Sequence, residues 1–207
     1  MKAIFFDYDG VLTTDKTGSI TTCRYLSHHT GIPYAAVAEA FRSHNEALNL
    51  GATSYAAIWG SVCKALGQDL PLELLVGAFE STPVNTAMLD LASGLSRSYT
   101  VGIITDNKAD RFEHLTRHQS LDKVFFPIVV SAKAGSSKQS SKIFERALAE
   151  IHVSPEESVF IDNTPNNLLA AAALGMETVH FDDERNDVEG LTALLRGRYG
   201  ISVHPSF

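Results

Sequence analysis

Short apolar segments rich in β-branched and aromatic residues recur along the chain, a pattern typical of strands that are buried on both faces. Polar residues or glycine bound each segment. We predict strands at Ala3–Phe6, Tyr99–Thr105, Val124–Val130, Ser158–Ile161 and Thr178–Phe181. Helical patterns separate the later segments, at Asp110–His118, Lys142–Ile151 and Asn166–Leu174. Strands that alternate with helices predict an α/β fold in which a parallel sheet carries helices on both faces.

The alternation is interrupted after the first strand. Between Ser19 and Thr82 the pattern is helical throughout, and glycines and prolines divide it into segments. The predicted helices are Ser19–His29, Pro33–Leu50, Ser54–Leu66 and Pro71–Ser81. The chain then returns to the α/β pattern through a helix over Asn85–Ser96. We therefore predict a sheet core formed by residues 1–14 and 84–207, and an inserted all-helical cap domain formed by residues 15–83.

Composition and charge indicate a globular protein and disfavour some classes of binding partner. The chain has 207 residues, of which 44% are hydrophobic and 20% charged, as in ordinary globular proteins. Its 24 acidic and 17 basic residues give a net charge of −7, which disfavours nonspecific binding to nucleic acid or to an anionic membrane. Because no segment approaches the roughly 18 apolar residues of a membrane span, we expect a soluble, cytoplasmic protein.

The strongest chemical signal follows the first predicted strand, where Asp7 and Asp9 are two residues apart. On an extended backbone, side chains at this spacing point the same way. Ligands of open α/β sheets bind beyond the carboxyl ends of the strands, and two carboxylates there can act as nucleophile and proton donor. A polar strand end that caps a turn is the alternative, and the two acids alone do not decide between them.

Residues at three further strand ends favour a catalytic role for Asp7 and Asp9 over the alternative that they cap a turn. Thr105 ends the second core strand and Asp106 follows it, Lys138 comes soon after the third, and Asp162 with Asn163 ends the fourth. A hydroxyl, backbone N–H groups and an ammonium together neutralise a phosphoryl group. Carboxylates beside them provide the oxygen ligands that Mg²⁺ prefers. These strand ends therefore predict a site for phosphoryl transfer.

In order and context, these residues resemble the motifs of the haloacid dehalogenase superfamily, specifically its phosphatase-like members with a helical cap after the first strand. The resemblance covers nearly the whole chain. The four motifs are matched by Asp7–Leu12, by Thr105, by Lys138 with Ile143 and Phe144, and by Asp162 with the alanine-rich helix that ends in Gly175 and Met176.

The resemblance implies a three-layer Rossmann-like core and a Mg²⁺-dependent phosphatase of small phosphorylated metabolites. It implies that Asp7 forms an aspartyl-phosphate and that Asp9 protonates the leaving oxygen and then activates water. It also implies the binding groups: Thr105, Asp106 and Lys138 for the phosphoryl group, and Asp7, the backbone carbonyl of Asp9 and Asp162 for Mg²⁺, with Asn163 beside the metal.

The chain departs from the superfamily pattern at two places. Many relatives carry a second acid beside the fourth-motif aspartate or a few residues later, where this chain has Asn163, Asn166 and Asn167. Amides can ligate Mg²⁺ but add no charge, so we expect weaker but not abolished Mg²⁺ binding. Gln139 replaces the proline that usually follows the motif lysine, and a serine can cap the following helix instead.

Several alternatives remain open. A phosphomutase would use the same aspartyl-phosphate but return the phosphoryl group to a bound sugar. Haloacid dehalogenases lack the second acid of the first motif, whereas Asp9 is present. A non-catalytic binding module is the alternative from another class, and the amides after Asp162 are its main support. Neither the particular substrate nor the oligomeric state can be inferred from these residues.

One pair of histidines lies outside the motifs. His114 and His118 are four residues apart on a predicted helix, so they can share a helix face. No glutamate lies between them in the spacing of a zinc protease motif. We interpret them as a surface pair.

Overall fold

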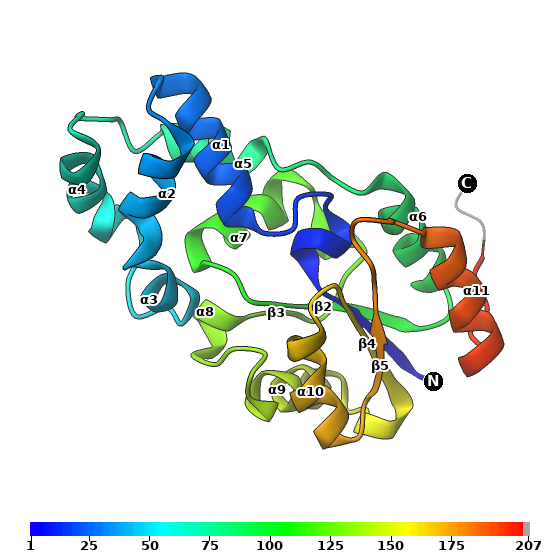
Figure 1. Cartoon of the computed structure of the whole chain (residues 1–207). Helices are drawn as coiled ribbons and strands as arrows, with labels where there is room; N and C mark the ends of the chain where they lie inside the picture. The colour runs from blue at the N-terminus through cyan, green and yellow to red at the C-terminus, as the bar shows by residue number, and fades with distance from the viewer. Residues whose placement is uncertain (205–207) are drawn as a thin grey trace.

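Five parallel strands form one sheet, in the order β3-β2-β1-β4-β5, in the computed structural model of the chain, which describes residues 1–204 (Figure 1). The strands are β1 (Ala3–Phe6), β2 (Thr100–Thr105), β3 (Ile128–Val130), β4 (Ser158–Asp162) and β5 (Glu177–His180). The predicted parallel α/β sheet is thereby confirmed. Residues 205–207, part of the predicted core, lie outside the described residues.

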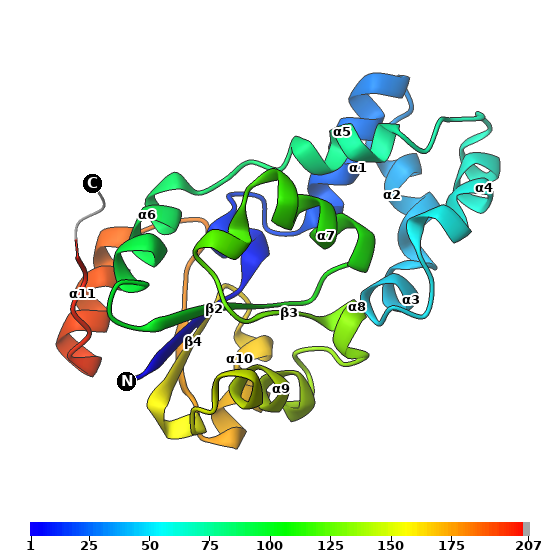
Figure 2. The same cartoon turned by 180° about the vertical axis from the view of Figure 1, so that it is seen from behind.

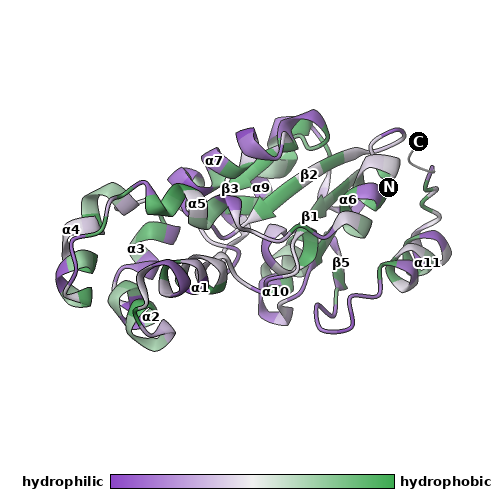
Figure 3. Cartoon of the chain, turned by 90° about the horizontal axis from the view of Figure 1, so that it is seen from above, coloured by the Kyte–Doolittle hydropathy of each residue, from purple (hydrophilic) through white to green (hydrophobic). Residues whose placement is uncertain are grey.

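Helices cover both faces of the sheet and make three layers (Figure 2). Ile4 and Phe6 of β1 pack with one group of helices, while Ala3 and Phe5 point to the other face. The first group consists of α6 (Thr86–Leu95), α7 (Ala109–His118) and α11 (Val188–Tyr199), and the second of α9 (Ser141–Ile151) and α10 (Pro165–Leu174). The strands are mostly hydrophobic, whereas the helices around them mix hydrophobic and hydrophilic residues (Figure 3).

Five α-helices lie between β1 and α6, and we call them the helical insert (residues 18–80). They are α1 (Gly18–Thr30), α2 (Tyr34–Arg42), α3 (Asn45–Asn49), α4 (Tyr55–Leu66) and α5 (Leu74–Glu80). The insert projects from the core at the end opposite to α6 and α11 (Figure 1). No helix within residues 1–204 is long and apolar enough to cross a membrane.

The two chain segments that join the insert to the core run side by side. Thr13 forms an antiparallel bridge with Val84, and the Thr14 N–H donates to the Pro83 carbonyl at 3.0 Å. Two adjacent connections make a narrow stem. The division of the chain at residues 14 and 84 into a core and a cap domain remains a prediction, and this stem lies at the predicted boundary.

The prediction of a single helix over Pro33–Leu50 is wrong, because the helix is interrupted between α2 and α3. The His44 N–H donates to the Phe41 carbonyl at 3.0 Å, a tighter bond than the α-helical one. The break turns α3 towards the core, where the Asn49 carbonyl accepts a 2.7 Å hydrogen bond from the Ser131 hydroxyl. Asn49 and Ser131 are far apart in sequence, so the helical periodicity does not reveal this contact.

The third strand is shorter than predicted, and two helices were not predicted. β3 begins only at Ile128, because Pro127 has no N–H to donate to a sheet and Phe126 before it is mostly exposed. The unpredicted helices are α8 (Ser131–Ala134) and α11. α11 follows an acidic loop and is capped at its N-terminus by Asp187, whose carboxylate accepts the Gly190 N–H.

Candidate active site

The residues predicted to carry chemistry converge at the carboxyl ends of three adjacent strands. Asp7 follows β1, Thr105 ends β2, and Asp162 ends β4. Because parallel strands all end at the same edge of the sheet, residues far apart in sequence meet there. A cavity of about 320 Å³ opens at this edge. Its lining includes Asp7, Asp9, Thr105, Asp106, Lys138 and Asn163 from the core, and Lys16, Thr17, Gly18, Ser19, Asn45 and Asn49 from the insert and the segment leading to it.

Lys138 links the strand ends electrostatically. Its ammonium lies 2.8 Å from Asp7 Oδ2 and 2.6 Å from Asp162 Oδ2, and only 2% of its side chain is exposed. Its backbone N–H donates to Asp106 Oδ1 at 3.0 Å, which fixes the loop before α9. Burial alone would lower the pKa of Lys138, but the three carboxylates together hold it above its usual range, so the lysine stays charged.

The carboxylates around this lysine outnumber the cations. Asp7 and Asp162 contact the Lys138 ammonium, and the charge of Asp106 also acts on it. Burial, together with the charge of Asp162, raises the pKa of Asp7 to about 7, although Lys138 acts in the opposite direction. The excess negative charge and the oxygen donors of Asp7 and Asp162 fit a divalent cation such as Mg²⁺. Asp162 is further held by the Thr164 N–H at 2.7 Å.

Asp9 is held by residues that the sequence analysis did not identify. Arg111 from α7 donates from its two terminal nitrogens to Asp9 Oδ2 and Oδ1, each at 2.9 Å, and Asn107 Nδ2 donates to Oδ2 at 2.8 Å. Arg111 is 1% exposed, and its guanidinium also donates to Asn107 and Thr82. Burial would lower the pKa of Arg111, but the Asp9 charge holds it raised, so the pair is ionic.

A signal for Arg111 was present in the sequence. Arg111 and Leu115 are four residues apart and therefore share the buried face of α7. A charged residue at an apolar position of a helix that follows a catalytic strand end indicates a buried ionic partner. The sequence alone does not name that partner, because Asp9 is 102 residues away.

Lys108 is a second cation that sequence analysis missed. It lines the cavity, is 6% exposed, and donates from Nζ to Ser19 Oγ of α1 at 3.1 Å. Burial and the neighbouring Arg111 charge lower the pKa of Lys108 to about 8. The cavity thus contains a cation beyond Lys138, and this one contacts the insert directly.

Asn163 lies against the turn that follows Asp9. Gly10 has φ +82°, and a Cβ at this position would collide with the Asn163 amide, so only glycine fits the turn. Asn163 is 5% exposed, and its Nδ2 has no hydrogen-bond partner within residues 1–204. A buried amide without a partner at the edge of the cavity is a group that a bound ligand or water can satisfy.

Comparison with known proteins identifies the class. Residues 1–175 match the family of haloacid dehalogenase-like hydrolases, and the chain belongs to this family. Its fold matches a predicted HAD-like family hydrolase from Porphyromonas gingivalis with a TM-score of 0.74 and 24% identity, over 95% of this chain and 98% of that one. It also matches a HAD family enzyme of Bacteroides thetaiotaomicron, solved as a magnesium complex, with a TM-score of 0.72 and 19% identity over 87% and 93% of the chains.

Curated relatives include proteins of different lengths. The chain is 26% identical to glyceraldehyde 3-phosphate phosphatase of Methanothermobacter thermautotrophicus, over 91% of this chain and 89% of that protein. It is 25% identical to acyl-CoA dehydrogenase family member 10 of Mus musculus over 98% of its own residues, but it spans only 20% of that protein's length.

Proposed function

We propose that the protein is a Mg²⁺-dependent phosphatase that hydrolyses small, polar phosphate monoesters through a covalent intermediate on Asp7. One observation carries the proposal. The Asp7 carboxylate faces the cavity and pairs with the buried ammonium of Lys138, beside the hydroxyl of Thr105 and two residues before a second acid, Asp9. The named phosphatase among the relatives supports the same activity.

In the first step, a carboxylate oxygen of Asp7 attacks phosphorus and the bond from phosphorus to the ester oxygen breaks. Lys138, the Thr105 hydroxyl and the backbone N–H of Asp106 bind the phosphoryl oxygens, because an anionic nucleophile approaches an anionic phosphate only when that charge is neutralised. Protonated Asp9 gives its proton to the leaving oxygen. The products of this step are an alcohol and an aspartyl-phosphate.

In the second step, Asp9 takes a proton from water, whose oxygen attacks phosphorus, and the bond to Asp7 breaks to release inorganic phosphate. In this arrangement both Asp9 oxygens accept N–H bonds from Arg111. A proton on either oxygen would displace one of these bonds. Donation in the first step therefore requires Asp9 to leave part of its contact with Arg111.

Asp7, the Asp9 backbone carbonyl and Asp162 are the groups that would hold Mg²⁺, which when bound neutralises charge on the phosphoryl group. The number of carboxylates around Lys138 supports this assignment, because one ammonium leaves negative charge uncompensated. Asn163 beside them adds an oxygen ligand but no charge. We therefore propose that Mg²⁺ binds weakly to the free protein and more tightly when a phosphate supplies further oxygens.

Asn163→Asp is expected to tighten Mg²⁺ binding to the free protein by roughly tenfold or more, because ligand charge controls affinity in such sites. Without Mg²⁺ the same variant is expected to unfold at a lower temperature, since it adds a buried carboxylate beside the uncompensated acids. Calorimetric titration and thermal unfolding, each with and without Mg²⁺, measure both effects. Equal Mg²⁺ affinities in the two proteins would show that position 163 does not tune the metal.

The cavity lining defines the class of leaving group that we propose. Apart from glycine, every lining residue is polar or charged, and Asn45, Asn49 and Ser19 of the insert provide hydrogen-bonding groups opposite the core. A volume of about 320 Å³ is at the lower end of the range for small-ligand sites. Both features favour a short, hydroxyl-rich or carbonyl-bearing alcohol, such as a phosphorylated sugar or polyol, over an apolar or macromolecular substrate.

Lys108 gives this substrate binding a pH dependence. With a pKa of about 8, its charge is present below pH 8 and lost above it, and a phosphate dianion binds the charged form. We expect kcat/KM to fall by up to tenfold per pH unit above about pH 8. Lys108→Met should lower kcat/KM below pH 8 and remove this decrease, whereas Lys133→Met, an exposed control, should keep it. An unchanged decrease in Lys108→Met would assign it to another group.

The activity is tested by measuring phosphate release from a chromogenic phosphate ester and then from a panel of phosphorylated sugars, polyols and short aldehydes. Turnover is expected with Mg²⁺, and its loss is expected with a chelator. Product alcohol that competes with water and returns as a phosphate ester would favour a phosphomutase. Absence of phosphate release from every member of the panel, by folded protein with Mg²⁺, would contradict the proposal.

A further inference from the structure

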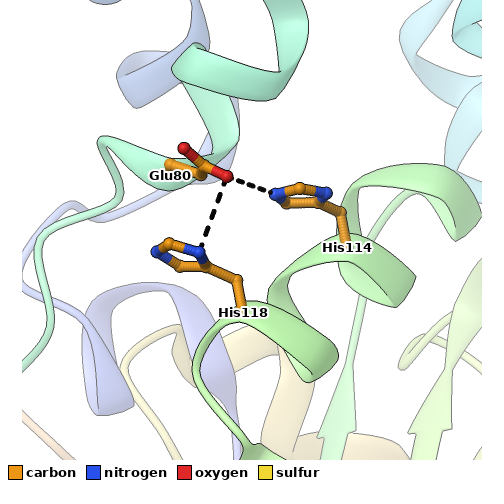
Figure 4. A group of neighbouring side chains, drawn as sticks. All are labelled: Glu80, His114 and His118. Atoms are coloured by element: carbon orange, nitrogen blue, oxygen red, sulfur yellow. Dashed lines mark hydrogen bonds and ion pairs between the residues drawn. The ribbon is translucent and has the colours of Figure 1, made fainter.

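The insert and the core also meet at a cluster of side chains that does not line the cavity. Glu80 at the end of α5 lies between His114 and His118 of α7 (Figure 4). Glu80 Oε1 is 3.1 Å from His114 Nε2 and 3.5 Å from His118 Nδ1. One donor atom from each of the three side chains lies within 4.8 Å of the other two. The glutamate that the histidine pair lacks in sequence is supplied by the insert.

The spacing of these atoms suits a tetrahedral metal ion. Bonds of about 2.0–2.2 Å to nitrogen and oxygen at tetrahedral angles place neighbouring ligand atoms roughly 3.3 Å apart. The two distances from Glu80 bracket this value. The helix fixes the histidines relative to each other, with ring planes only 17° apart, and Phe79 packs near the His114 ring at 6.2 Å. Rotation of the two imidazole rings about their side-chain bonds would aim one nitrogen of each at an ion beside Glu80, since the three donor atoms already lie within 4.8 Å of one another.

We propose that Glu80, His114 and His118 form a second metal site, which binds Zn²⁺ or a similar transition-metal ion. Two imidazoles and one carboxylate are a common zinc ligand set, with water in the fourth position. Mg²⁺ is disfavoured because it requires a shell of oxygen ligands. The side chains are 25–44% exposed, so an ion reaches them directly from solvent.

The site would join two parts of the protein that sequence separates. Glu80 belongs to the insert, whereas both histidines belong to the core, and Glu80 and His114 are 34 positions apart in the sequence. A bound ion would hold α5 against α7 and so resist movement of the insert away from the core. Hydrogen exchange of α5 amides is expected to slow when Zn²⁺ is added, and this readout does not depend on phosphatase activity.

The site is tested by titrating Zn²⁺ into the full chain in competition with a chromophoric chelator, in excess Mg²⁺ so that Zn²⁺ is disfavoured at the cavity carboxylates. We expect one tight Zn²⁺ per chain. Glu80→Gln and His118→Gln should each weaken it by about 100-fold or more, because even the hydrogen-bond partners of metal ligands cost 10–100-fold when removed. The matched controls are Glu113→Gln, on the same helix as the two histidines, and His28→Gln, on α1. Both residues are exposed, and both variants should bind Zn²⁺ like the wild type.

Thermal unfolding provides the second measurement. Zn²⁺ should raise the Tm of the wild type and of both controls, and should raise it far less in Glu80→Gln and His118→Gln, whose Tm without metal should match the wild type because the residues are at the surface. Wild-type Zn²⁺ affinity in both cluster variants would overturn the proposal. If Zn²⁺ binding were lost in His118→Gln but not in Glu80→Gln, the proposed link between insert and core would be wrong. The absence of tight Zn²⁺ binding by the wild type would also overturn it.

Discussion

Replacing Asp7 by asparagine is expected to lower turnover of a phosphate monoester by roughly 10⁴- to 10⁶-fold, the loss that accompanies removal of central groups in other enzymes with covalent intermediates. An amide is a poor nucleophile, so the aspartyl-phosphate no longer forms. The fold should remain, because Lys138 keeps its 2.6 Å contact with Asp162. Moreover, the raised pKa of Asp7 indicates that its charge is costly where it is buried. Phosphate release and thermal unfolding are the two measurements.

The control for this substitution is Asp122→Asn, which changes an exposed aspartate that does not line the cavity and should retain wild-type activity. Asp9→Asn is a graded comparison. Loss of a general acid–base costs roughly 10²- to 10⁴-fold, less than loss of the nucleophile, and substrate binding should change little. If Asp7→Asn turned over phosphate esters at the wild-type rate, the covalent mechanism would be wrong.

The second large effect is on stability. Arg111→Met is expected to lower the free energy of unfolding by about 3–5 kcal/mol, because removing one partner of a buried ion pair leaves the other charge without compensation. For a chain of this size that corresponds to a decrease in Tm of about 6–20 °C. Asp9 loses both guanidinium hydrogen bonds but keeps the one that Asn107 donates. Arg111→Lys should recover part of the lost stability, since an ammonium keeps the positive charge but cannot form the bidentate pair of hydrogen bonds.

The matched control is Arg117→Met on the same helix, where the arginine forms an exposed ion pair with Glu113. Such pairs contribute about 0–1 kcal/mol, so its Tm should change little. A double-mutant cycle with Asp9→Asn isolates the pair. Arg111→Met should destabilise the Asp9→Asn protein much less than the wild type, because no charge is then left unpaired. Equal losses in the two backgrounds would show that Arg111 acts through packing.

Sequence determined the parts of this protein in which a local pattern has a single structural solution. Apolar runs separated by helical periods specify a parallel sheet, and its strands must end at one edge. Asp7, Asp9, Thr105 and Lys138 could therefore be placed together before any distance was known, and all four line the cavity. Asp162 was placed at the same edge, and its ion pair with Lys138 joins it to them.

Only the tertiary structure decided which residues from distant elements pair with these groups. Three contacts join residues that are tens of positions apart in sequence. They are the Arg111–Asp9 ion pair, the hydrogen bond from Ser131 to Asn49 of α3, and the contact of Glu80 with His114. Helical periodicity says which face of a helix is buried, but not what that face meets. The partner depends on how the insert packs on the core, and that packing is set by side-chain shape and charge summed over many contacts rather than by any local motif.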